Sequence, residues 1–384
     1  MDDVGPSPIS FTAPPFRFGD GVASELPETL TRVGISNPLV VTDRGIEEAG
    51  ILETVTADVD AVDRYYATRE PSTGDFEDLP DGPVDGVIAI GGGSSLDAGK
   101  IAALLLAADG PLEEYIGTGT VTETPLPIVA VPTTSGTGSQ STQTAVVKYD
   151  GVKRGISDES LRPAFALVDP TLTEDLPSAV TARSGFDALI HAVESFAARE
   201  YRWVDERPIT YQGANPVSRP LSRRALDLVH GSLERAVHDG DDRSARRDLS
   251  LGAHLAGLAF SNAGLGAIHA LASAVGGMRD RPHGECLAAS LEIGLAYNRP
   301  VRRGEYAAMA RHLGVGTDAD AFVEELVRVR DSIGLPSSLA DLGLDEGEVD
   351  DIVEATVIQE RRLVTNPRQS TEELRSAVAR GFRD

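Results

Sequence analysis

Short apolar runs alternate with helical patterns along the first 178 residues. The clearest apolar runs have the length of buried strands and lie at 38–42, 84–90, 127–131 and 164–168. The second run leads into Gly91-Gly92-Gly93, and Ser94 is then placed to cap a helix that continues through Leu106. Strands that alternate with helices predict parallel βα units. We therefore expect an α/β domain over residues 1–178.

The remainder of the chain carries long helical patterns and few strand signals. The most regular of these patterns lie at 223–238, 248–261, 319–333 and 345–358. Because the pattern changes near residues 175–180, we place a second, all-α domain at 179–384. The segment 199–220 is rich in charge and proline and is interpreted as an excursion between helices.

The charge of the chain excludes two classes of partner. The net charge is −25, and only Lys100, Lys148 and Lys153 among the 35 basic residues are lysine. A surface this acidic repels the phosphates of nucleic acid and of anionic lipid, so neither is an expected partner. Since concentrated salt screens such repulsion, the excess of acid indicates adaptation to a salt-rich cytoplasm. A GC-rich genome explains the lack of lysine but not the excess of acid.

Membrane and secretion signals are missing from the sequence. No stretch offers about 18 consecutive apolar residues, and the start, Met1-Asp2-Asp3-Val4, lacks the features of a signal peptide. The single cysteine, Cys286, excludes an intrachain disulfide and fits a reducing compartment. A cytoplasmic location is therefore expected. Any metal site must use histidine and carboxylate, because several thiolates are not available.

Two polar loops follow predicted strands and suit a nucleotide. One opens with Gly91-Gly92-Gly93-Ser94, and the other is Pro132-Thr133-Thr134-Ser135-Gly136-Thr137-Gly138-Ser139. Glycine-rich turns that open helices offer free N–H groups to phosphate, although such a turn is also a common tight connection. The usual dinucleotide and ATPase fingerprints both fail here, because Leu96 and Ser94 replace required glycines. Two such loops at strand ends nevertheless match the place where open α/β sheets bind ligands.

Asp43 ends the first clear strand. Its carboxylate is placed to accept the adenosine ribose 2′-hydroxyl and to repel a 2′-phosphate, which favours NAD over NADP. A strand-terminating turn residue is the alternative reading of the same aspartate.

Four residues form a candidate metal set. Asp187 and His191 lie four residues apart in a helical stretch and so share one face. His269 and His283 lie in apolar or glycine-bearing segments, where core histidines are the alternative. Together an aspartate and three imidazoles bind Fe²⁺ or Zn²⁺ with a coordination position left open. The other histidines lie on charged or amphipathic patterns and are interpreted as structural or solvated: His230, His238, His254 and His312.

The order of these motifs resembles the iron-containing (group III) alcohol dehydrogenases, within the dehydroquinate synthase-like superfamily. The glycine loop, the Pro-Thr-Thr-x-Gly-Thr-Gly-Ser loop, Asp-x-x-x-His and two histidines fourteen apart occur in the family's order. The match runs from about Phe18 to Pro300 and includes Asp169-Pro170, Ala214-Asn215-Pro216, Leu255-Ala256-Gly257-Leu258-Ala259-Phe260 and Tyr297-Asn298. The last 80 or so residues carry little signature.

The resemblance implies a fold and a set of roles. It implies a Rossmann-like dinucleotide-binding domain, an all-α metal-binding domain and a cleft between them. Cofactor contacts would come from Asp43, Gly92, Gly93, Ser94, Asp97, Thr133, Thr134, Ser139 and Lys153, with Lys153 near the ribose. The metal ligands would be Asp187, His191, His269 and His283. A homodimer or larger homo-oligomer is also implied.

Ser273 marks a departure from the family. Many relatives carry a second histidine at this position, near the substrate, so their proton route does not transfer to this chain. We expect metal-dependent hydride transfer between a small alcohol and NAD, with Ser273 and the cofactor ribose hydroxyl as candidate proton relays.

Other chemistries remain open. An oxo acid reductase of the maleylacetate or 4-hydroxybutyrate type would use the same site. A carbon–oxygen lyase resembling dehydroquinate synthase is disfavoured by the small number of lysines, and a non-catalytic nucleotide-binding protein by the complete ligand set. The sequence chooses neither the alcohol nor the metal.

Overall fold

A computed structural model describes residues 8–59, 63–80, 82–150, 152–204 and 211–383. Its first half is built on a parallel sheet of six strands in the order β1-β9-β6-β4-β2-β3. The strands are β1 (Phe16–Phe18), β2 (Pro38–Thr42), β3 (Asp63–Tyr66), β4 (Gly86–Gly91), β6 (Ile128–Pro132) and β9 (Phe165–Val168). The residues of β2, β4, β6 and β9 are all buried, as their unbroken apolar runs predict.

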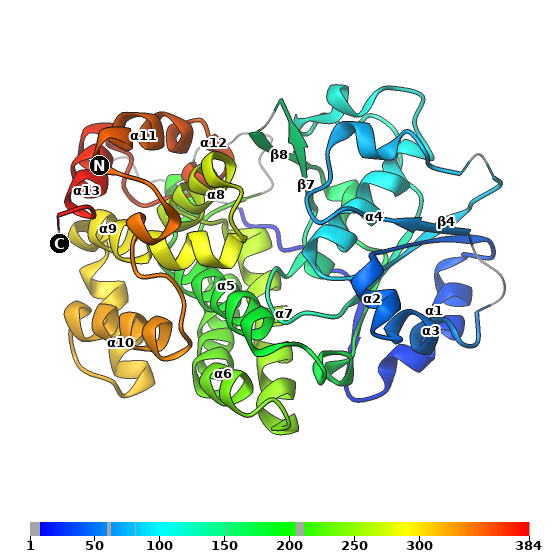
Figure 1. The fold of residues 1–384 in the computed structure, drawn as a ribbon, viewed down its shortest axis with the longest axis horizontal. Coiled ribbons are helices and arrows are strands. Elements are labelled where there is room, and N and C mark those ends of the chain that lie inside the picture. The colour runs from blue at the N-terminus through cyan, green and yellow to red at the C-terminus, as the bar shows by residue number, and fades with distance from the viewer. Residues whose placement is uncertain (1–7, 60–62, 81, 151, 205–210, 384) are drawn as a thin grey trace.

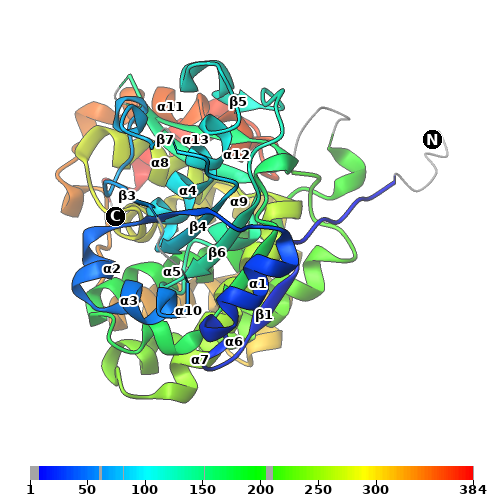
Figure 2. The same cartoon turned by 90° about the vertical axis from the view of Figure 1, so that its right-hand side faces the viewer.

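Helices cover both faces of this sheet (Figures 1 and 2). On one face, Val40 and Ile88 pack against α1 (Leu26–Val33), α2 (Arg44–Glu48) and α3 (Ile51–Thr56). On the other face, Leu39 and Val87 pack against α4 (Gly93–Leu105). The alternation of side chains along each strand thus feeds two apolar layers. The expected α/β architecture is confirmed.

A smaller sheet extends this half toward the helices. It joins β5 (Gly117–Thr118), β8 (Val152–Ser157) and β7 (Thr144–Tyr149), with β7 and β8 antiparallel. The reading of the sequence missed this hairpin, although the dipeptide Asp150-Gly151 is a strong hairpin signal. Asp150 adopts the left-handed conformation at φ 49°, as such a turn requires. Gly151 lies outside the described residues.

The second half is helical (Figure 1). Its helices are α5 (Ser178–Ala197), α6 (Ser218–His238), α7 (Arg243–Ala263), α8 (Ala267–Arg279), α9 (His283–Leu313), α10 (Ala319–Ser332), α11 (Val349–Val357), α12 (Glu360–Leu363) and α13 (Thr371–Arg380). One apolar core unites most of them, with Phe186, Leu271 and Leu287 among its fully buried members. The all-α prediction for this half is confirmed, and each of the four helical patterns noted in the sequence overlaps an observed helix.

The start of α4, the predicted excursion and the N-terminal segment add to or correct what the sequence predicted. Gly92, not Ser94, occupies the N-cap position of α4, and the Ser94 hydroxyl instead donates to the carbonyl of Arg69 at 2.6 Å. Residues 205–210 of the predicted excursion lie outside the described residues. The start of the described chain packs on the helical half, since the Thr12 amide donates to Asn262.

Within the described residues, no single helix combines the length and the apolar character needed to cross a membrane. In that part of the chain, α7 and α8 taken together pass by length and composition, but they are bent by 99° relative to each other.

Candidate functional site

A cleft of about 630 Å³ lies where the glycine loops of the sheet meet α5, α8 and α9. Of the residues predicted from the sequence, those that line it are Gly92, Gly93, Ser94, Asp97, Thr134, Ser139, Lys153, Asp187, His191, His269, Ser273 and His283. Asp43 and Thr133 do not line it. The fold therefore brings most of the candidate cofactor and metal residues, which come from both halves of the chain, to one cavity.

The sheet side of the cleft is shaped by backbone. Gly92 is the N-cap of α4, so N–H groups of the first turn are left without helical partners at the positive end of the helix. A side chain at position 93 would place its Cβ 2.6 Å from the Thr137 methyl group, which leaves room only for glycine. The Thr133 amide donates to the Gly91 carbonyl at 3.0 Å and so joins the two loops. This arrangement suits a phosphate group.

A buried ammonium group braces the second loop. Lys100 is 1% exposed, and its Nζ donates to the Ser139 carbonyl, the Ser139 hydroxyl, the Thr142 hydroxyl and the Thr144 carbonyl at 2.7 to 3.0 Å. Burial lowers the pKa of Lys100 to about 8, and the nearby Asp97 carboxylate opposes that shift. Asp97 in turn accepts from the Ser139 hydroxyl at 2.6 Å and from the Val146 amide at 3.0 Å.

All three lysines of the chain therefore lie at this cleft. Lys148 and Lys153 line it, and Lys100 lies beneath the loop that contains Ser139.

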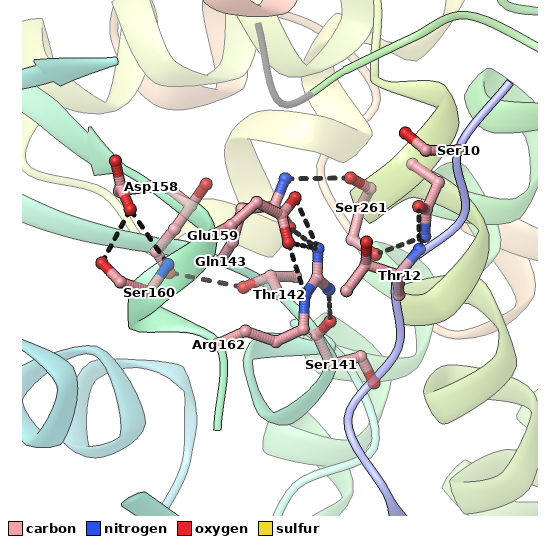
Figure 3. A network of polar contacts seen from close by, with 12 residues as sticks. Ser10, Thr12, Ser141, Thr142, Gln143, Asp158, Glu159, Ser160, Arg162 and Ser261 are labelled. Carbon is pink, nitrogen blue, oxygen red and sulfur yellow. Dashed lines mark hydrogen bonds and ion pairs between the residues drawn. The ribbon is translucent and has the colours of Figure 1, made fainter. Parts of the chain in front are cut away.

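Arg162 fastens the same loop to the helical half (Figure 3). Its guanidinium donates to the Ser141 carbonyl, to the Gln143 side chain at 2.7 Å and to Glu159. Gln143 then donates to the carbonyl of Ser261 on α7 at 2.9 Å. The loop is thus held from both sides, which keeps the wall of the cleft in place.

The helical side of the cleft is shaped by buried side chains. Asp187 and His191 project from α5 and His269 from α8, and their ligand atoms all lie within 4.8 Å of one another. Asp187 Oδ1 lies 3.5 Å from His191 Nε2 and 3.3 Å from His269 Nε2. His283, at the start of α9, is half-buried at the edge of the group, with its Nε2 4.0 Å from Asp187 Oδ1. A carboxylate and three imidazoles converging in this way fit Fe²⁺ or Zn²⁺.

Glu194 orients this group and was not singled out from the sequence. Its buried carboxylate lies 2.7 Å from His269 Nδ1 and accepts the amides of Gly266 and Ile268 at 3.0 and 2.8 Å. With Nδ1–H donated to Glu194, the Nε2 lone pair of His269 is directed toward Asp187. A signal was present, because Asp187, His191 and Glu194 occupy positions i, i+4 and i+7 of one helix face.

The protonation preferences of the group suit a cation. Burial opposes ionisation of Asp187, but the surrounding imidazoles of His191, His269 and His283 lower its pKa far below the ordinary value. Burial lowers the pKa of His191 to about 3, so this imidazole is neutral. Burial also opposes a charge on His269, yet the hydrogen bonds that its protonated imidazole can donate to Asp187 and Glu194 outweigh this effect and raise its pKa. Negative potential is thus concentrated at His269.

Aromatic contacts fix the imidazole of His191. It stacks between Phe260 and His269, with ring centroids 4.1 and 4.4 Å away. Phe260 and Leu265 also give the cleft an apolar side beside the candidate ligands. Ser273 lies one helical turn beyond His269 and is buried.

The two predicted residues outside the cleft lie close behind it. Asp43 caps α2 through the Ile46 amide and accepts the Ser95 hydroxyl at 2.7 Å, so it contacts the first turn of α4. Thr133 is fully buried.

Three of the remaining histidines make contacts away from the cleft. His230 lies 2.7 Å from Glu325 and His312 lies beside Asp227, which agrees with their interpretation as structural or solvated residues. His254 is fully buried near the Ser141 hydroxyl.

Comparison with known proteins accounts for nearly the whole chain. Residues 13–170 match the family model "Iron-containing alcohol dehydrogenase", and residues 181–379 match "Fe-containing alcohol dehydrogenase family, C-terminal". Long-chain-alcohol dehydrogenase 1 of Geobacillus thermodenitrificans is 35% identical over 91% of this chain and 90% of its own length.

Solved structures agree with these matches. A 1,3-propanediol oxidoreductase aligns with a TM-score of 0.89 and 29% identity, covering 98% of this chain and all of its own. The sulfoacetaldehyde reductase of Bifidobacterium kashiwanohense in complex with NAD⁺ aligns with a TM-score of 0.85 and 26% identity, covering 98% of this chain and 99% of its own. The chain belongs to the iron-containing alcohol dehydrogenase family.

Proposed function

We propose that this protein is a metal-dependent, NAD-linked alcohol dehydrogenase that also reduces the corresponding aldehydes. The observation that carries the proposal is the single cleft, in which a phosphate-compatible helix start faces Asp187, His191 and His269. Family membership and the NAD⁺ complex of a structural relative support it. We also propose that His283 completes the set of metal ligands and that the candidate cofactor residues contact NAD.

Each wall has a proposed task. The amides around Gly92, Gly93 and Ser94 bind the cofactor pyrophosphate, with Thr134, Ser139, Asp97 and Lys153 along its path. NAD is favoured over NADP, because the Asp43 carboxylate behind the glycine loop repels a 2′-phosphate.

Asp187, His191, His269 and His283 would hold Fe²⁺ or Zn²⁺, which would supply Lewis acidity toward an alcohol oxygen. Glu194 keeps His269 in position, and the apolar side chains of Phe260 and Leu265 exclude water from the reacting carbon. NAD⁺ held in this way would supply the acceptor for the hydride of the carbinol carbon. The hydroxyl proton leaves through Ser273 or the cofactor ribose hydroxyl.

The direct test follows NADH absorbance in concentrated KCl. Protein loaded with Fe²⁺ or Zn²⁺ is mixed with NAD and a panel of short alcohols and diols. We expect NADH to form only with metal, and we expect His269→Ala to reduce the rate by roughly 10³-fold, since several kcal/mol of metal assistance is lost. A His269→Ala variant with unchanged turnover would contradict the ligand assignment.

We further propose a division into domains at residues 1–178 and 179–384, because β9 ends at Val168 and the helical half begins with α5 at Ser178. A cytoplasmic location and a homodimer or larger homo-oligomer are proposed on the single buried Cys286 and on family membership, respectively. Light scattering tests the assembly.

The acid excess is proposed to be a salt adaptation. At a net charge of −25, self-repulsion falls as about 1 M salt reduces the screening length to ~3 Å. Thermal stability should therefore rise with KCl, and a flat profile would contradict the proposal.

A further inference from the structure

Two adjacent arginines line the cleft beside the candidate metal ligands. Arg361 and Arg362 belong to the short helix α12, and both are partly buried. Both line the same cavity as Asp187, His191, His269 and His283. The pair therefore faces the place where the metal and the substrate are expected to meet.

Neither arginine has a carboxylate partner within 4.0 Å among the described residues. Arg361 donates to the Thr144 hydroxyl at 2.9 Å and to the Tyr211 hydroxyl at 2.8 Å. Arg362 donates to the Gln359 side chain at 2.8 Å, and its buried Nε has no hydrogen-bond partner in the described part of the chain. Both guanidiniums thus donate hydrogen bonds to neutral groups, and further N–H donors remain available.

Two other cations that line the cleft have carboxylate partners. Lys153 lies 2.6 Å from Glu70, and Arg183 lies 3.0 Å from Glu285. In a chain with 60 acidic and 35 basic side chains, a carboxylate partner is easily supplied. Because an unpaired buried charge is costly, two adjacent arginines without one indicate that an anion is supplied by a ligand.

The arginine pair is held in a fixed position. Beyond α12, the Thr365 hydroxyl donates to the Leu265 carbonyl, and the Asn366 side chain accepts the Ala267 amide, both at 2.9 Å. These bonds join the segment to the first turn of α8, which carries His269. The arginines and the candidate metal ligands are therefore parts of one rigid arrangement, as specific recognition requires.

We propose that Arg361 and Arg362 bind the carboxylate of the substrate, so that the preferred substrates are ω-hydroxycarboxylates and the matching aldehyde acids. This inference rests on the proposed dehydrogenase function. The hydroxyl end reacts at the metal side: the carbinol carbon loses a hydride to NAD⁺, the hydroxyl loses its proton, and the product is an aldehyde that keeps the carboxylate. A planar carboxylate matches the fork of a guanidinium better than a hydroxyl or methyl group does.

The kinetic test compares 4-hydroxybutyrate with butan-1-ol, which has the same number of carbons but no carboxylate. Metal- and NAD-loaded protein should prefer 4-hydroxybutyrate. Arg362→Gln and Arg361→Gln should lower kcat/KM for 4-hydroxybutyrate by roughly 10- to 100-fold, the usual effect of losing a charge-assisted hydrogen bond, and should lower kcat/KM for butan-1-ol much less. Arg362→Lys, which keeps the charge, should retain part of the preference.

The matched control is Arg154→Gln. Arg154 is exposed on β8 beside Lys153, so the variant removes the same charge near the cleft without touching α12. It should leave both substrates unaffected. An equal loss for both substrates in the Arg362→Gln variant, or a higher KM for NAD with either one, would assign the arginines to the cofactor and overturn the proposal. A wild-type protein that prefers butan-1-ol would also overturn it.

A binding test separates this proposal from the proposed function. Butanoate, which cannot be oxidised at its methyl end, is titrated calorimetrically into metal- and NAD-loaded protein. Weaker binding by Arg362→Gln supports the carboxylate site even when no alcohol is oxidised. Butanoate affinity equal to that of the wild type shows that the anion binds elsewhere, on the metal for example, and overturns the proposal. Protein that holds metal and NAD yet oxidises none of these substrates contradicts the dehydrogenase function alone.

Discussion

The two walls of the cleft are built by different means. The sheet wall presents backbone amides at the start of α4, and its side chains mainly brace the loops from behind, as Lys100 does. The helical wall presents buried side chains, and Asp187, His191 and His269 converge from two helices. Ligand binding at the backbone site depends on the shape of the loop and the position of the helix start. Ligand binding at the side-chain site depends on the charge of each neighbouring residue. Damage to one wall should therefore leave the other wall's ligand bound.

Loss of the ammonium group of Lys100 should give the largest effect on stability. In Lys100→Met, the acceptors of the Ser139 loop become unsatisfied in a buried position. We expect a loss of about 3–5 kcal/mol in the free energy of unfolding, measured by denaturant titration. Lys148→Met removes a partly exposed lysine and should change stability by less than about 0.5 kcal/mol. Equal stability of both variants would show that the Lys100 bonds contribute nothing net.

Glu194→Gln tests the helical wall alone. The amide cannot serve His269 Nδ1 as a charged acceptor, so the imidazole loses its fixed orientation. Metal affinity should fall about 10- to 100-fold, measured by competition with a chelator, while the Kd for NAD stays the same. Glu324→Gln, an exposed change on α10, is the control. A parallel loss of NAD affinity would break the separation between the walls.

Gly93→Ala tests the sheet wall. The new Cβ meets the Thr137 methyl group at 2.6 Å, so the loop must move away from the start of α4. We expect NAD to bind about tenfold more weakly, equivalent to about 1.4 kcal/mol, and metal affinity to stay the same. Gly231→Ala, with open space around the site on α6, should leave both affinities unchanged. If Gly93→Ala binds NAD as tightly as the wild type does, the pyrophosphate must bind elsewhere.

Arg328→Gln changes a residue that lies outside both walls, and we expect it to have the smallest effect on stability. Arg328 bonds Glu234 and Glu325, and its hydrogen bond lowers the pKa of Glu234 to about 2. A lowered acid pKa adds stability above about pH 4.5, and that stability is lost as the pH falls toward 2. The variant should lose less than about 1 kcal/mol at neutral pH, and the difference should vanish in acid. A constant difference across that range would point to packing instead of charge.

The sequence predicted the sheet wall through local patterns. The strands at 38–42 and 127–131 are unbroken apolar runs followed by polar loops, and this alternation alone places the loops at one edge of a sheet. Asp187 and His191 were predictable because helix periodicity puts them on one face. The grouping of His269 with them was offered from residue type and surroundings, and it became specific only with the family resemblance, since no local spacing connects α5 to α8.

Other features depend on contacts across the fold. Arg361 and Arg362 lie about 170 residues from His191 in sequence, and nothing in a run of charged residues distinguishes a cleft from a solvated surface. Their role follows from Thr365 and Asn366, which bind the start of α8. The contacts of Lys100 could not be predicted either, because the sequence does not indicate which residues a single lysine in an apolar helix will contact.

The gathering of every lysine at the cleft has a practical consequence. Apart from the chain's own α-amino group, the side-chain amines of this protein are Lys148 and Lys153, which line the cleft, and Lys100, which is buried. Amine-directed reagents are ordinarily indiscriminate surface labels, but here they would act as affinity reagents for one cavity. Coupling the protein to a solid support through lysine would block the very opening through which a small molecule enters. Immobilisation should therefore use carboxylates, which the surface offers in excess.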